Sequence, residues 1–374
     1  MDNQRPVFLV GGALGNGGSG GDVGVAIAEL GLKVRQFSDA SALRAALEET
    51  EPLALFAPAG GSLFGEVCLA LRSHARFARV PAFGVAAHPT DLTFIDLFQA
   101  GGDDVLPADR TAVLRRLRPL VTKVGDPPSR REGTAIVAGA DRVWRAILGR
   151  TLFNGGLSVR FVDDLSATLT EGAAAGVKLV VVADEDGEAA VALARKARAA
   201  GHAAAWIAVV PPRRIGAISE ALRDLERTSV TDAYAPPENV LFLANELMRP
   251  RGTDNRRSAR VLFGTRVSFR VAGRESDEVG FTYNVSEGGL YVRTAAPVEP
   301  GEEVWLELWP PRSERRVRLA GRVAWRRHLG PNDFATVPAG FGVELTEGLA
   351  GDLERWRSGY RAFAGQAFGP GGRP

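Results

Sequence analysis

The sequence predicts a multidomain protein of α/β plus β class. Two doubly wound (βα)5 domains are expected first, followed by a small antiparallel β-barrel with a C-terminal helix. Over the first two-thirds of the 374 residues, short apolar strand-like runs alternate with helical segments in two successive series of five. After about residue 250, many short strands follow with Gly and Pro signals between them, and an amphipathic helix ends the series. These two patterns are typical of parallel α/β sheets and of a small barrel.

The first series covers residues 1–124, and its strands are short and apolar, as suits a parallel sheet that is buried on both faces. The expected strands are Val7–Val10, Lys33–Phe37, Leu53–Ala57, Ala82–Ala87 and Asp104–Leu106. Helices are expected near Asp22–Leu30, Ala40–Glu49, Ser62–Arg72, Asp91–Ala100 and Thr111–Val121.

The second series covers residues 133–249, after a linker rich in Pro, Gly and charge at Gly125–Gly133. Its expected strands are Thr134–Ala138, Ser158–Val162, Leu179–Ala183, Ala205–Val210 and Asp232–Tyr234. A helix is expected at Glu188–Ala200, and the last helix of the series should end near Met248. Two domains of the same order are therefore predicted in tandem.

The barrel is predicted for residues 251–365, with residues 366–374 as a disordered tail. Thr265–Val271 alternates, with Val267, Phe269 and Val271 on one face, which indicates a half-buried antiparallel strand. Further strands are expected at Val279–Asn284, Leu290–Arg293, Glu303–Leu308, Arg316–Trp325 and Phe341–Leu345, and a helix at Leu349–Phe363. The helical spacing of its apolar residues predicts that this helix plugs or flanks the barrel.

Charge and composition limit the classes of partner. The formal net charge is +2, and residues 251–374 hold 19 Arg against 15 Asp and Glu, an excess of +4 that leaves −2 for the rest. This excess is too small to predict binding to duplex nucleic acid. No apolar run reaches the roughly 18 residues of a membrane span. The N-terminal residues lack a signal-peptide pattern, the four histidines lack metal-ligand spacing, and Cys68 is the single cysteine. A cytoplasmic protein without a metal or cofactor is expected.

Two short motifs lie about one hairpin apart near the start of the last third. The first is Arg256-x-x-x-Arg260, which includes Arg257, and the second is Asn284-x-Ser286-x-x-Gly289, which includes Gly288. Arginine binds phosphate bidentately, contacts the O6/N7 edge of guanine and stacks on purines. Asn and Ser side chains offer further hydrogen bonds. The two glycines are expected to permit positive φ and a close approach of the backbone to a ligand.

In this order and spacing, the two motifs resemble the signature of the PilZ domain. The runs GRVAW (321–325) and GFGVEL (340–345) also look like late strands of that family, and the resemblance covers about Arg251–Phe363. It implies a β-barrel receptor for the bacterial messenger cyclic di-GMP. It assigns Arg256, Arg257, Arg260, Asn284, Ser286, Gly288 and Gly289 to ligand binding. No catalytic residue is expected. The implied output is a relay to a protein partner, such as motility or polysaccharide machinery.

Both α/β series resemble the receiver domains of response regulators, most clearly in AGGDDVLPADR (100–110). A working receiver needs an acidic pair for Mg²⁺, a phosphoacceptor Asp and a Lys. The first copy has Gly11-Gly12, Ala57-Pro58 and Ala108 at these places. In the second copy Asp184 and Asp186 follow strand three, but the acidic pair is replaced by Ala138-Gly139 and Pro236 replaces the Lys. Both copies are therefore predicted to be degenerate.

Two alternatives remain at the level of sequence. One is an interaction scaffold whose PilZ-like domain does not bind the nucleotide. The other is an NAD(P)-dependent oxidoreductase, because Gly15-x-Gly17-x-x-Gly20 follows the first strand and Asp39 comes about 20 residues later. A recognisable catalytic pair for hydride transfer is missing, and a run of seven glycines in eleven residues satisfies many glycine patterns. In the favoured reading, Arg251–Arg260 is mobile without ligand and becomes ordered over the dinucleotide, which changes the arrangement of the domains.

Overall fold

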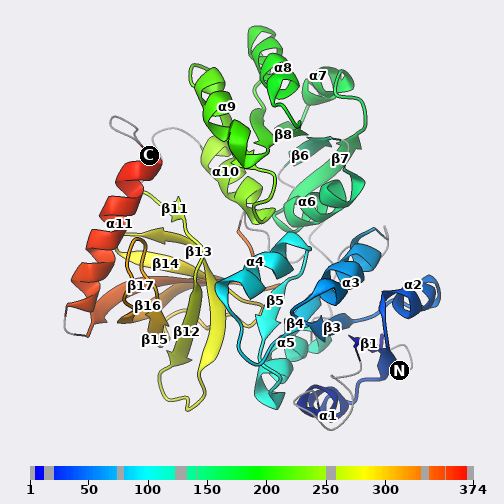
Figure 1. Cartoon of the computed structure of the whole chain (residues 1–374), viewed down its shortest axis with the longest axis vertical. Coiled ribbons are helices and arrows are strands. Elements are labelled where there is room, and N and C mark those ends of the chain that lie inside the picture. The colour runs from blue at the N-terminus through cyan, green and yellow to red at the C-terminus, as the bar shows by residue number, and fades with distance from the viewer. Residues whose placement is uncertain are drawn as a thin grey trace.

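The computed structural model describes residues 5–11, 21–73, 80–122, 133–139, 141–249, 258–329, 337–349 and 351–368. In these residues the predicted fold class is confirmed. Two five-stranded parallel sheets are followed by a closed antiparallel barrel with a C-terminal helix (Figure 1). The linker between the two α/β domains, the glycines at 12–20 and residues 369–374 of the expected tail lie outside the described residues. No helix in the described ranges is long and apolar enough to cross a membrane.

The first sheet has the order β2-β1-β3-β4-β5, which is one of the two common doubly wound orders. Its strands are β1 (Val7–Val10), β2 (Val34–Phe37), β3 (Ala54–Pro58), β4 (Ala82–Val85) and β5 (Asp104–Leu106). Its helices are α1 (Gly21–Glu29), α2 (Ala40–Glu49), α3 (Ser62–Arg72), α4 (Asp91–Gln99) and α5 (Arg110–Thr122). Helices α1 and α5 cover one face of the sheet, and α2, α3 and α4 cover the other.

The second sheet repeats this order, since β10-β9-β8-β6-β7 is the same sequence of strands counted from the opposite edge. Its strands are β6 (Gly133–Ala138), β7 (Leu157–Val162), β8 (Val177–Ala183), β9 (Ala205–Val210) and β10 (Thr228–Asp232). Its helices are α6 (Arg142–Asn154), α7 (Ala167–Gly172), α8 (Glu188–Ala199), α9 (Ile215–Leu222) and α10 (Glu238–Met248). Helices α6 and α10 pack on one face, and α7, α8 and α9 on the other.

The last strand of the second sheet differs from the prediction. The structure places β10 at Thr228–Asp232, where it pairs with residues 206–210 of β9, whereas Asp232–Tyr234 was expected. Asp232 accepts a hydrogen bond from the Tyr234 amide (2.8 Å), which is a side-chain turn that ends the strand. Tyr234 therefore lies outside the sheet and is 64% exposed. The strand therefore ends at the turn-forming aspartate, two residues before the predicted end.

The barrel is closed by six strands in the order β13-β12-β15-β16-β17-β14, with β14 returning to pair with β13. The strands are β12 (Arg266–Val271), β13 (Glu278–Ser286), β14 (Gly289–Arg293), β15 (Glu303–Leu308), β16 (Val317–Arg327) and β17 (Gly340–Gly348), and short β11 (Val261–Leu262) adds to β13. Helix α11 (Asp352–Phe368) flanks the barrel, and its Trp356 is fully buried in the barrel core. The Trp356 indole donates a hydrogen bond to the Ser286 carbonyl (3.2 Å).

The barrel packs against both α/β domains, and the contact with the first domain is partly apolar. Phe281 of β13 joins the core of the first domain, where it stacks on Phe94 (5.2 Å between centroids) and lies edge-on to Phe98 (5.9 Å). Figure 1 shows α4 and β5 of that domain beside the barrel strands β12 and β13. The barrel and the first domain therefore share apolar core, which stabilises their arrangement by the burial of aromatic surface.

A buried group of charges lies where the barrel meets the first domain. Asp104, at the start of β5, accepts hydrogen bonds from Arg116 (3.1 Å), the Thr294 hydroxyl (3.1 Å) and the Ala295 amide (2.8 Å). Arg116 also donates to Glu278 of the barrel (3.2 Å). Asp104 is fully buried and Arg116 is 2% exposed. A charge this deeply buried is tolerated because it is paired and hydrogen-bonded.

The second α/β domain contacts the other two domains through Asp103, which precedes Asp104, and through Glu238. Asp103 accepts from Arg72 of its own domain (3.2 Å) and from Arg150 of α6. Glu238, the first residue of α10, accepts from Arg293 of β14 (2.6 Å). Burial, together with the nearby Arg150 charge, lowers the pKa of Arg72 to about 10, so its guanidinium remains charged at neutral pH. We call the buried ion pairs of Asp103, Asp104 and Glu238, which together join all three domains, the three-domain junction.

Replacement of Trp356 by alanine is expected to destabilise the barrel by about 3 to 5 kcal/mol, because a buried aromatic side chain leaves a cavity. The measurement is hydrogen exchange in peptides from β16 and β17, which should become faster. Leu349→Ala is the matched control, since Leu349 is 54% exposed. Unchanged exchange in the Trp356→Ala protein would show that α11 does not contribute to the barrel core.

Candidate functional site

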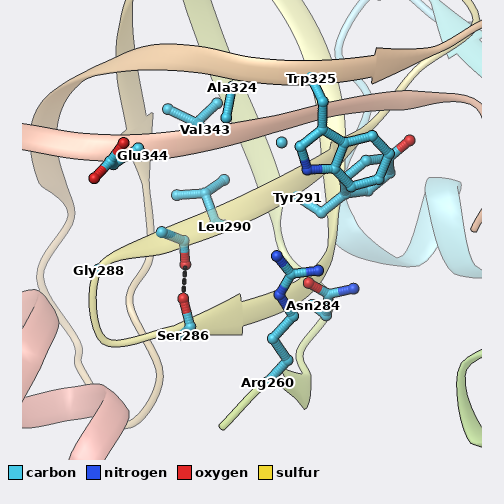
Figure 2. A pocket seen from close by; sticks show the side chains of 12 residues that line it. Arg260, Asn284, Ser286, Gly288, Leu290, Tyr291, Ala324, Trp325, Val343 and Glu344 are labelled. Atoms are coloured by element: carbon cyan, nitrogen blue, oxygen red, sulfur yellow. Dashed lines mark hydrogen bonds between the residues drawn. The ribbon is translucent and has the colours of Figure 1, made fainter. Parts of the chain in front are cut away.

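A pocket of about 200 Å³ opens on the barrel beside the β13–β14 hairpin (Figure 2). Strands β13 and β14 form one side of it, β16 and β17 form the other, and Arg260 enters from the segment before β11. The lining residues are Arg260, Asn284, Ser286, Gly288, Gly289, Leu290, Tyr291, Ala324, Trp325, Gly342, Val343 and Glu344. Five of the seven residues predicted from the motifs are among them. Arg256 and Arg257 lie outside the described residues.

The second motif forms the hairpin itself. Ser286 and Gly289 face each other across the tight turn, and the Ser286 hydroxyl donates to the Gly289 carbonyl (3.1 Å). Asn284 pairs with Tyr291 and is 5% exposed. Figure 2 shows the Asn284 carboxamide beside the Arg260 guanidinium at the edge of the pocket. The hairpin therefore brings an amide, a hydroxyl and a guanidinium together.

The two glycines differ from the expectation. Positive φ is found at neither Gly288 nor Gly289. Gly289 is instead needed because β17 passes close by, so a Cβ there would lie 2.5 Å from the Val343 carbonyl oxygen. At Gly288 a Cβ would meet no atom within 4 Å, so the space around it is open. One glycine thus serves strand packing, and the other leaves room at the mouth of the pocket.

Helix α11 holds the hairpin and the segment that carries Arg260. The Tyr360 hydroxyl donates to the Ala259 carbonyl (2.6 Å). The Ser258 hydroxyl accepts from the Glu287 amide in the hairpin turn (3.2 Å). Arg361 forms an ion pair with Glu287 as well. These contacts place the backbone beside Arg260 against the turn of the second motif, so the two motifs meet in the folded barrel.

Sequence reasoning missed an aromatic wall, made of Tyr291 and Trp325. Their rings stack with centroids 4.9 Å apart at 30°, as Figure 2 shows. The indole of Trp325 lies over Gly342, where a Cβ would come within 2.5 Å of its Nε1. The strand register shifts between Val323 and Trp325. Alternation along GRVAW therefore could not show which way the tryptophan faces. The one signal in the sequence was the presence of an aromatic residue at the end of that run.

The arrangement has the chemistry of a site for an anionic, aromatic ligand. A guanidinium can bind a phosphate or a guanine edge, and the flat ring of Trp325 can stack on a base. Asn284 and Ser286 offer polar groups beside them. In the described residues no cluster of His, Cys, Asp and Glu is placed to bind a metal ion.

The carboxyl edges of the two α/β sheets, where a receiver domain would be phosphorylated, are occupied by other contacts. In the first domain a Cβ at Gly11 would lie 3.1 Å from the Pro58 ring and 3.2 Å from Leu63, so apolar groups fill this edge. In the second domain Asp184 accepts from the Ala189 (2.9 Å) and Ala190 (3.3 Å) amides. Its carboxylate therefore satisfies the N-terminal amides of α8, as anions commonly do at helix N-termini.

The comparisons with known proteins identify the barrel. Residues 254–357 match the family model described as "PilZ domain". The barrel with its helix is therefore a PilZ domain, and this family consists of cyclic di-GMP receptors and effectors that are generally not enzymes. A search of the curated proteins finds no match to the chain.

Solved structures with similar segments include PilZ proteins and response regulators. The inhibitor of motility MotI/DgrA of Bacillus subtilis is 21% identical, with 31% of this chain and 56% of that chain covered and a TM-score of 0.25. The PilZ domain of CeSA from a cellulose-synthesizing bacterium is 15% identical over 29% and 99% of the two chains, at a TM-score of 0.23. A probable two-component system response regulator/GGDEF domain protein is 17% identical over 66% and 100%, at a TM-score of 0.29.

Neither α/β domain is expected to take up a phosphoryl group from acetyl phosphate with Mg²⁺. The reason is that Pro58 occupies the acceptor position in the first domain. In the second domain Asp184 is engaged at a helix N-terminus, and Ala138-Gly139 stand where the Mg²⁺-binding acidic pair is expected. Intact mass spectrometry is the measurement. A phosphorylated species that disappears in an Asp184→Asn variant would contradict the degenerate assignment.

Proposed function

We propose that the chain is a cyclic di-GMP receptor and that the nucleotide binds in the barrel pocket. The observation that carries this proposal is the meeting of the two sequence motifs in one pocket. Arg260 comes from the first motif, and Asn284, Ser286 and Gly288 come from the second. The PilZ match to residues 254–357 supports the same ligand.

Each part of the ligand has a group to meet it. Cyclic di-GMP offers two phosphates and two guanines, and Arg260 is suited to a phosphate or to the O6/N7 edge of a guanine. Asn284 and Ser286 are suited to hydrogen bonds with a base or phosphate. Trp325 offers a ring for stacking, and Arg256 and Arg257 of the first motif are proposed as further ligand-binding residues.

The output is proposed to be a relay to a protein partner through the arrangement of the barrel and the second α/β domain. The buried contacts of the barrel with both α/β domains support this, because a change at the barrel alters surfaces on all three. The two α/β domains act as interaction modules without phosphorylation. We place the receptor in the cytoplasm and expect a partner from motility or polysaccharide machinery.

The two alternatives are weaker on the described residues. Asp39, the acidic residue of the dinucleotide pattern, accepts from the Ser41 and Ala42 amides (2.9 Å each) and is thereby the cap of α2. An interaction scaffold without nucleotide binding does not explain why residues of both motifs line one pocket. A titration with cyclic di-GMP and NADPH side by side separates the three functions.

Calorimetry should show saturable binding of cyclic di-GMP with a Kd between nanomolar and low micromolar, or about 8 to 12 kcal/mol, because several charge-assisted contacts converge. NADPH, titrated in parallel, should give no saturable heat. If cyclic di-GMP shows no binding at tens of micromolar, the scaffold function replaces this proposal.

Arg260→Ala is expected to weaken cyclic di-GMP binding by about 1.5 to 3 kcal/mol, the range for a hydrogen bond to a charged group. The melting temperature of the ligand-free protein should hardly change. Arg322→Ala is the matched control, since Arg322 is an exposed arginine of the same barrel that does not line the pocket. A large loss of melting temperature with unchanged affinity would make Arg260 a structural residue.

A further inference from the structure

The strand that carries the pocket also carries the contact with the second α/β domain. Along β14, Leu290 and Val292 point into the barrel core, while Tyr291 and Arg293 share the opposite face. Tyr291 lines the pocket, and Arg293, two residues further, pairs with Glu238 of α10. The pocket and the Arg293–Glu238 ion pair are therefore linked by one short strand.

A line of aromatic rings runs from the pocket to α10. Trp325 stacks on Tyr291 (4.9 Å), and Tyr291 meets Tyr283 edge-on (6.0 Å). Tyr283 in turn meets Phe242 of α10 edge-on (6.0 Å). Tyr283, Tyr291 and Phe242 are each buried in one cluster. Because Phe242 belongs to the second α/β domain, the back of the aromatic wall is supported from outside the barrel.

Polar contacts fix the same surface. The Tyr283 hydroxyl donates to the Glu238 backbone carbonyl (2.8 Å), and Arg293 donates to the Glu238 carboxylate (2.6 Å). Arg293 is 5% exposed, Tyr283 is 6% exposed and Glu238 is 7% exposed. The guanidinium carbon of Arg293 also lies 3.2 Å from the centroid of the Phe98 ring. The Tyr283 hydroxyl and the Arg293 guanidinium of the barrel are thus both held by Glu238 in the first turn of α10.

We propose that Glu238 and Phe242 of the second α/β domain are positioning residues of the nucleotide pocket. They act through Arg293 and Tyr283, which hold the aromatic wall in the orientation that stacks on a base. This inference rests on the proposed function. Its consequence is that nucleotide binding and the docking of α10 on the barrel stabilise each other, because an effect of one on the other is reciprocal in free energy.

The junction supplies a matched control. Arg150 and Asp103 form an ion pair between the first and second α/β domains that is as buried as the Arg293–Glu238 pair, with Arg150 8% exposed and Asp103 7% exposed. No barrel residue takes part in this pair. Its removal costs stability at an interface between domains, but it deletes none of the hydrogen bonds by which Glu238 holds Arg293 and Tyr283.

The experiment is calorimetric titration of the full chain with cyclic di-GMP. Arg293→Met and Phe242→Ala are expected to raise the Kd about 5- to 50-fold, within the usual range of coupling between sites. The Kd of Arg150→Met should stay within about twofold of that of the unmodified chain, because Arg150 is not a member of the Arg293–Glu238 pair. Arg293→Lys, which keeps the charge, should restore most of the affinity. Tyr283→Phe removes only the hydroxyl and should raise the Kd by a few-fold, which keeps the test open should a larger substitution fail to fold.

Hydrogen exchange in peptides from α10 provides a second readout, which a purely structural role would not move. Cyclic di-GMP should increase protection of residues 238–248 in the unmodified chain and in Arg150→Met, but not in Arg293→Met. If the unmodified chain does not bind the nucleotide, the proposed function fails. If it binds and the Arg293, Phe242 and Tyr283 variants bind equally well, or Arg150→Met weakens binding as much as they do, only the positioning role is overturned.

Discussion

The arrangement of the three domains depends on charge that is buried where they meet. Asp104 is fully buried, and the groups that hydrogen-bond to its carboxylate, Arg116, Thr294 and Ala295, come from its own domain and from the barrel. Removal of one member of such a pair typically costs about 3 to 5 kcal/mol, because the other is left buried and uncompensated. The barrel therefore docks on the first domain stably only when these buried charges are correctly paired and hydrogen-bonded.

One hairpin then connects the junction to the pocket. Strands β13 and β14 carry Glu278 and Phe281 toward the first domain, Tyr283 and Arg293 toward the second, and Asn284 toward the pocket. The turn is held from the far side by α11. A ligand that binds at this hairpin contacts an element whose other end is fixed by buried ion pairs. The hairpin that lines the pocket therefore contacts both α/β domains directly.

The fold and part of the candidate site were accessible from the sequence because they depend on local patterns. Apolar runs with Gly and Pro breaks identified both parallel sheets and the barrel, and the second motif is a hairpin in sequence as well as in space. The rest depends on tertiary geometry. A register shift hides the direction of Trp325. Gly289 is explained by the close passage of β17, where a Cβ would lie 2.5 Å from the Val343 carbonyl oxygen, and not by positive φ. Asp103 and Asp104 belonged to a receiver-like phrase, and nothing local to them indicated partners more than 40 residues away in other domains.

The central claim is that nucleotide binding in the barrel stabilises its docking on the second α/β domain, and a distance between the two tests it directly. Burial raises the pKa of Cys68, the single cysteine, to about 12, so spin labels will react with introduced cysteines instead. Lys196→Cys on α8 and Ser358→Cys on α11 are exposed sites on the second domain and on the PilZ domain. Pulsed electron resonance should give a distance distribution that narrows to one population when cyclic di-GMP saturates the protein. A distribution that stays unchanged at saturation, with binding verified in the same sample, would contradict the account.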